Sequence, residues 1–191
     1  MSRVVLVVHI VINHQLESIE MHSFKVLVDI CSEFTLEFLD ETNNKTIEEL
    51  QKNGATSHVV NLQMVQTQRA IFAVGMFSIF EAKLQEELNC KNGFSKIKKI
   101  LKNENEINIL ETFGYFYLAI NVLKHGRGGS YDTLISKADL LPFRVKKPDD
   151  NFFDEGDVSE ISTLVEVDNY FVKHCAKVIC DVTEVLRQVD H

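Results

Sequence analysis

The chain has 191 residues, of which 45% are hydrophobic and 25% charged, and its formal charge is −8 at pH 7. This length fits one domain with a sizeable core. The acidic balance argues against broad, non-specific affinity for nucleic acid, which needs a basic surface to displace counterions; a local basic patch is still compatible with this charge.

The first element is an apolar run from Val4 to Ile12. It is shorter than the roughly 20 residues that a membrane helix needs, and no small cleavage-site residues follow it, so we expect neither a membrane span nor a signal peptide. Seven of its nine residues are β-branched. That composition favours a strand or an extended arm that docks on a partner. We therefore expect an apolar N-terminal arm over residues 1–15.

Beyond the arm, apolar residues recur at helical spacing in four stretches. They predict helices over residues 16–40, 59–88, 106–125 and 168–187. Residues 41–57 lose this periodicity and indicate a helix–helix connection, and the basic segment SKIKKILK indicates a short amphipathic turn. We expect an all-α protein: residues 16–191 form a single domain, an antiparallel bundle of four to five main helices.

Residues 126–167 predict a long irregular loop inserted into this domain. Two strand-like pieces, LLPFRVK and STLVEV, flank the acidic and aromatic segment PDDNFFDEGD. A loop of this length in a compact domain is usually functional or packs as a lid.

The four cysteines are widely spaced and form no CxxC pair. A chain of this size does not need disulfides, so we expect reduced thiols and a cytoplasmic location. No HExxH motif occurs, and the histidines and glutamates of residues 14–22 do not share one helical face. We therefore expect no metal site and no cofactor.

The main candidate site is the end of the third predicted helix, in the stretch NVLKHGRGGSY. Asn121 and His125 are four residues apart and share a helical face, so both can point at one ligand. Arg127 can offer two parallel hydrogen bonds to a phosphate. A second reading is structural: Lys124 and His125 complement the helix dipole, and Gly126 ends the helix with positive φ. GRGG matches no nucleotide-binding loop, and we expect no helix to begin after it.

A second candidate is Glu81, a carboxylate within the apolar stretch SIFEAKLQEEL. If it were partly buried beside a histidine or arginine, it would orient that residue and raise that residue's pKa. Alternatively it is a surface residue that pairs with its helix neighbours.

A long helix with SIFEAKLQEEL, followed by one that ends NVLKHGRG, resembles the HEPN superfamily of small helical bundles. The resemblance covers Val59 to about Gly129. The family motif is an Arg, often followed by Asn, with a His four to six positions after the Arg. Asn121 and His125 match its polar residue and its histidine, and Glu81 matches an acidic helix residue. The motif Arg is missing, because Ile120 precedes Asn121 and no Arg occurs between Glu111 and His125.

The resemblance implies a metal-independent RNA-binding protein or endoribonuclease in a defence or toxin context, acting as a homodimer. Asn121, His125 and Arg127 would then be the catalytic residues, with Lys124 and Glu81 in substrate binding. The chemistry would be proton transfer by His125 for attack by a 2′-hydroxyl, with an Arg stabilising charge on the phosphate. The alternative is a non-catalytic interaction module that docks a partner protein or another copy through the apolar arm and the acidic loop.

Overall fold

The computed structural model describes residues 3–148, 150, 161 and 163–189, and the surroundings of side chains from Phe24 onward. Across these residues the protein is all-α, as expected. The elements in chain order are α1 (Arg3–Lys52), α2 (Thr56–Glu87), α3 (Gly93–Asn103), α4 (Ile107–His125), α5 (Gly129–Ser136), the 3-10 helix η1 (Ala138–Leu140) and α6 (Asn169–Val189).

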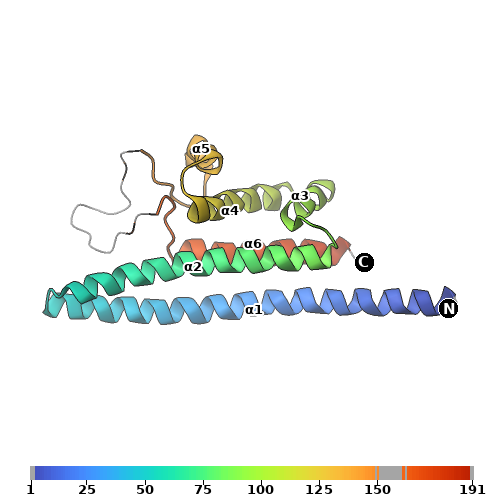
Figure 1. Cartoon of the computed structure of the whole chain (residues 1–191), viewed down its shortest axis with the longest axis horizontal. Coiled ribbons are helices and arrows are strands. Elements are labelled where there is room, and N and C mark those ends of the chain that lie inside the picture. Colours follow the sequence, from blue (N-terminus) through green and yellow to red (C-terminus); the bar gives the residue numbers. More distant parts are fainter. Residues whose placement is uncertain (1–2, 149, 151–160, 162, 190–191) are drawn as a thin grey trace.

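The long helices form three layers (Figure 1). α2 and α6 lie side by side in the middle layer. α1 packs against both from one side, α3 and α4 cover the other side, and α5 packs on α4. α1 and α4 run antiparallel to α2 and α6, and α1 extends past the bundle at its N-terminal end. The expected antiparallel bundle is therefore confirmed. No helix in the described part of the chain is long and apolar enough to cross a membrane.

The N-terminal apolar run is helical, so the prediction of a strand or extended arm was wrong. Residues 4–12 belong to α1, which continues without a break past residue 16. β-branched residues lower helix propensity by only a fraction of a kcal/mol each, which is a weak preference that a helical context overrides.

The predicted helix–helix connection over residues 41–57 exists but is much shorter, because α1 continues to Lys52 and only residues 53–55 separate it from α2. Within this stretch the hydroxyls of Thr42 and Thr46 donate to the carbonyls of Phe38 and Thr42, at 2.8 and 2.7 Å. Thr46 is buried. These bonds satisfy the threonine side chains inside the helix, so polar composition did not end it.

The helices predicted from residues 59, 106 and 168 are confirmed as α2, α4 and α6, and the basic segment lies in α3. Side chains cap two helices. The Asp168 carboxylate accepts from the N–H of Phe171 at 2.7 Å, and the Asn92 side chain accepts from the N–H of Ser95 at 2.8 Å. Such caps satisfy backbone donors that have no partner within the helix.

Phenylalanines from four helices build the centre of the core. Phe77 of α2 packs against Phe113 of α4 with ring centroids 6.2 Å apart, and Phe94 of α3 lies edge-on to Phe113 at 5.3 Å. Phe116 of α4 contacts Phe171 of α6 at 5.1 Å. All but Phe94 are fully buried. These contacts fix α4 against α2 and α6, and so fix the position at which α4 ends.

The segment predicted as an irregular loop contains α5 and η1, and a helix begins at Gly129, the last glycine of GRGG. The two strand-like pieces meet in one antiparallel bridge between Val145 and Val165. The Tyr131 hydroxyl of α5 donates to the carbonyl of Lys146 at 2.7 Å and joins α5 to this bridge. The acidic and aromatic segment lies almost entirely outside the described residues.

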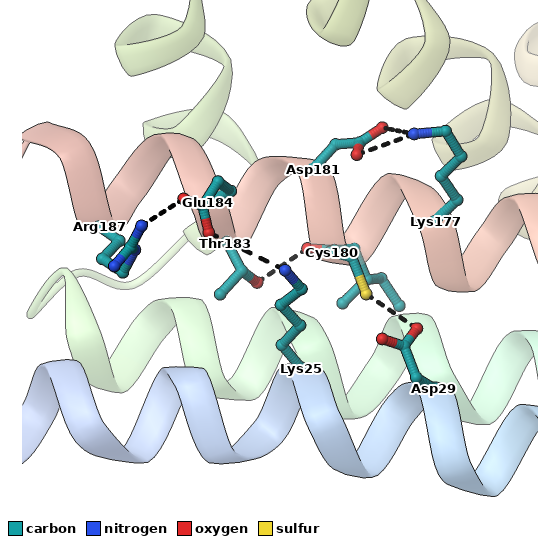
Figure 2. A network of polar contacts seen from close by, with 9 residues as sticks. Lys25, Asp29, Lys177, Cys180, Asp181, Thr183, Glu184 and Arg187 are labelled. Carbon is teal, nitrogen blue, oxygen red and sulfur yellow. Dashed lines mark hydrogen bonds and ion pairs between the residues drawn. The ribbon is translucent and has the colours of Figure 1, made fainter.

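Polar contacts tie α1 to α6 (Figure 2). The Lys25 ammonium lies 3.9 Å from the Glu184 carboxylate, and the Cys180 thiol donates to Asp29 at 3.1 Å. Burial, and then the hydrogen bond to Asp29, raises the pKa of Cys180 to about 12. Burial also raises the pKa of Cys175. All four cysteines are free, and these two thiols stay protonated at neutral pH.

Candidate functional site

The candidate site is the corner at which the chain leaves α4 and enters α5. Gly126 follows His125 with φ at +74°, a conformation that suits glycine, and its N–H donates to the carbonyl of Val122 at 2.8 Å. The predicted role of Gly126 as the helix stop is confirmed. A Cβ atom placed at Gly126, Gly128 or Gly129 would have no neighbour within 4 Å. The backbone of the corner is therefore open to an approaching ligand.

Four of the five predicted site residues lie at this corner. Lys124, His125 and Arg127 are exposed, and Asn121 is half-buried one helical turn before His125. The Arg127 guanidinium lies 5.7 Å from the centre of the Tyr131 ring, which is itself buried. Because Tyr131 is held by Lys146, the ring gives Arg127 a fixed support at the start of α5.

The corner has the properties of an anion-binding surface. Two permanent cations and an imidazole lie within four residues. The positive end of the α5 dipole begins there, whereas Lys124 and His125 offset the negative end of the α4 dipole. Asp132, in the first turn of α5, opposes the positive charge. The exposed side chains can contact phosphate groups from solvent.

Glu81 lies elsewhere. Its carbonyl oxygen is 2.9 Å from the position of a Cβ built on Gly93, at the start of α3. Phe94, the next residue, packs against Tyr117 of α4 at 5.5 Å. His125 lies about two turns beyond Tyr117 on α4, which is about 12 Å along the helix axis at 1.5 Å per residue. The structure therefore places half-buried Glu81 beside α3, and not with the four residues of the corner.

No group of three potential metal ligands occurs among the side chains that the structure describes. His174 and Cys175 are adjacent on α6 and lie in different environments. Cys175 is fully buried, whereas the His174 ring lies against Tyr170 with centroids 3.8 Å apart.

Sequence reasoning missed a polar cluster that joins three helices. Arg69 of α2 is buried, and its Nη2 donates to Asp40 of α1 at 2.9 Å. Its Nε donates to the side chain of Asn169 at 2.8 Å, and that amide donates to the second oxygen of Asp40 at 2.6 Å. One signal was present, because Arg69 is the only charged residue between His58 and Glu81. An isolated charge within a long uncharged stretch of a helix usually has a specific partner.

An open cavity of about 450 Å³ adjoins this cluster, between α2 and the start of α6. Its lining includes Gln66, Arg69 and Glu166. Burial raises the pKa of Glu166, although Arg144, 3.7 Å away, acts in the opposite direction. The charge of Arg69 is balanced by Asp40, so we interpret the cluster as a structural connection between α1, α2 and α6.

Comparison of the chain with known protein families, with curated proteins and with solved structures found no match. Function is therefore inferred from the residues of the corner and from the exposed surfaces of the helices.

Proposed function

We propose that this protein binds RNA through the corner between α4 and α5, as a HEPN-like helical protein. One observation carries the proposal: Lys124, His125 and Arg127 are exposed together at a helix end whose glycine backbone is open. Arg and Lys contact phosphates from such a position, and phosphate contacts supply most of the affinity of non-specific nucleic-acid binding. A local patch suffices for this, even on a chain of charge −8.

His125 is the residue on which a ribonuclease activity would depend. Its imidazole would take the proton from a 2′-hydroxyl as the 2′-oxygen bonds to the phosphorus, and Arg127 would face the phosphate in place of the motif Arg. The P–O5′ bond would break, and the leaving 5′-oxygen would take a proton from water. Asn121, on the same face one turn earlier, would hydrogen-bond a base or sugar. These steps use side chains and solvent and need no metal ion.

The first test measures binding of a fluorescent single-stranded RNA by anisotropy. We expect the Lys124→Gln/Arg127→Gln variant to bind at least tenfold more weakly than the wild type. The matched control is Lys99→Gln/Lys102→Gln, which removes two exposed charges from α3. Equal losses in both variants would mean that RNA senses only net charge, and the proposal would be wrong.

The second test asks whether bound RNA is cut. The wild type and His125→Ala are incubated with RNA in excess EDTA, and the products are separated on a denaturing gel. Cleavage that His125→Ala abolishes would support the enzymatic form of the proposal. Binding without cleavage would leave an RNA-binding protein, and cleavage that persists in His125→Ala would exclude His125 as the catalytic group.

The proposal places the protein in the cytoplasm, in a defence or toxin system, and this context can be tested in cells. We expect induced wild-type protein to slow bacterial growth and His125→Ala to restore it at equal expression. Equal growth of both strains would remove the toxin part of the proposal.

A second candidate function, a non-catalytic protein-interaction module, is favoured by a different observation. Large apolar side chains of α1 and α2 are exposed, among them Phe34 at 71% and Phe38 at 61%. Exposed aromatic residues in a row mark a protein-binding surface on a helix. An interaction module would keep its partner when the corner is mutated, whereas an RNA-binding protein would lose its ligand.

A further inference from the structure

The outward face of α2 carries no charge over most of its length. From residue 59 to residue 80 the only charged side chain is Arg69, which is buried and paired. Val60, Ile71 and Ile79 on this helix are more than half exposed. The exposed face of a helix in a monomeric protein normally carries charged residues, so an uncharged face indicates a contact with another molecule.

A stripe on α1 continues this face. Phe24 stacks against Phe80 of α2 at 6.3 Å, whereas Asp29 contacts α6. At about 100° per residue, Leu27, Phe34 and Phe38 lie on the side of α1 that points away from α6, and therefore next to α2. Leu27 is 54% exposed. The two helices thus share one apolar surface.

We call this surface the hairpin face and define it by Leu27, Phe34, Phe38, Val60, Ile71 and Ile79. From their exposed fractions, these side chains present roughly 700 Å² of accessible surface, close to the area that each partner buries in a standard interface. A surface of this size on the bundle is large enough for a stable complex.

Its residue pattern fits a second copy of the same chain. The outward positions of α2 recur at spacings of three and four residues. They are Val60, Met64 and Thr67 before Ile71, and the smaller Gly75, Ser78 and Ala82 after it. If two α2 helices cross antiparallel with Ile71 on the two-fold axis, larger residues face smaller ones. The pairs are Val60 with Ala82, Met64 with Ser78 and Thr67 with Gly75. A two-fold interface requires such self-complementarity.

Charge supports the same occupant. Each chain carries −8, so two copies repel unless they meet through a surface without charge. On the exposed surface of α1, Asp29, Glu33 and Glu37 lie outside the stripe, and Glu41, seven residues after Phe34, marks its end. The part of the hairpin face that lies on α2 carries no exposed charge between residues 59 and 80.

We propose that two copies of this chain associate antiparallel through their hairpin faces, with Ile71 at the two-fold axis. α4 packs on the opposite side of α2, through Phe77 and Phe113, so the corner of each copy stays outside the interface. The proposal does not depend on RNA binding, and each copy keeps its own corner.

The association state of the full chain tests the proposal by sedimentation velocity over a range of micromolar concentrations. We expect a dimer for the wild type and a monomer for Ile71→Glu. The matched control is Leu140→Glu, which places the same charge at a position in η1 that is 69% exposed and should leave the dimer intact. Circular dichroism checks that both variants keep their helicity.

The register is tested by cross-linking. In a Cys31→Ser background, Ile71→Cys should form a disulfide-linked dimer on mild oxidation, because the two thiols meet at the axis. Ile107→Cys, at the exposed start of α4, is the control and should stay monomeric. A monomeric wild type, a dimer that survives Ile71→Glu, or equal cross-linking of both cysteine variants would overturn the proposal. RNA affinity should be retained in Ile71→Glu, which separates failure here from failure of the RNA proposal.

Discussion

Arg69 of α2 and Asp40 of α1 form an ion pair of 2.9 Å in which the two side chains differ sharply in exposure. The arginine side chain is 8% exposed and the aspartate 44%. Asn169 of α6 bonds to both, so the pair holds three helices at the end of the bundle where α6 begins. The burial of the guanidinium makes its partners necessary, because an unpaired buried charge is costly.

We expect Asp40→Ala to lower the free energy of unfolding by about 2 kcal/mol, since it leaves the buried Arg69 without its counter-ion. The matched control is Glu49→Ala. Glu49 pairs with Lys52 at the same 2.9 Å, but both side chains are well exposed. Loss of the Glu49 carboxylate should cost much less, because solvent screens this exposed pair. Urea unfolding of the two variants measures the difference, and equal losses would show that Arg69 is solvated.

Gly93 lies where no side chain fits. A Cβ there would lie 2.7 Å from the Cβ of Leu84 and 2.9 Å from the carbonyl oxygen of Glu81. Gly93→Ala should therefore push α3 away from α2 and destabilise the protein by about 2 kcal/mol. Gly114, inside α4, has no neighbour within 4 Å, so Gly114→Ala should stabilise the helix by roughly 0.5 kcal/mol. Opposite shifts of the melting temperature are expected, and a stable Gly93→Ala would contradict the close contact.

Glu166 should make stability depend on pH. Burial raises its pKa in the folded protein, so the folded state holds this proton more tightly than the unfolded state. Its contribution to stability is complete below the ordinary glutamate pKa and is lost as pH rises through the folded-state value. The glutamine of Glu166→Gln cannot ionise, so the variant does not lose stability in this way as pH rises. We expect the variant to melt higher than the wild type at neutral pH, with the difference shrinking towards about pH 4. A difference that is constant with pH would exclude this role.

Periodicity predicted the main helices because each buries one continuous apolar face, and the positive φ of Gly126 followed from its place after Lys124 and His125. Local composition failed where long-range packing decided the outcome. The stretch around Thr46 reads as a connection, yet it is helical because its side chains bond to the helix and pack beneath α2. The β-branched run near the N-terminus reads as a strand, yet it continues α1.

In the candidate site too, residues close in sequence could be grouped in advance, whereas residues far apart in sequence could not. Asn121, Lys124, His125 and Arg127 are neighbours in sequence, so their grouping at one corner could be predicted. Glu81 could be placed only by the packing of α2 against α3, which depends on Phe94 and Gly93. The contact of Arg69 with Asn169 joins residues 100 positions apart, and no local pattern reveals such a pair.

The central claim, that the corner binds RNA phosphates, is tested most directly by the salt dependence of RNA affinity. For each protein the binding constant is measured over a range of salt concentrations, and the slope of its logarithm against log salt reports the number of phosphates contacted. We predict that Arg127→Gln reduces this slope by about one relative to the wild type, whereas Lys99→Gln on α3 leaves it unchanged. An unchanged slope for Arg127→Gln, or no measurable RNA binding by the wild type, would contradict the account.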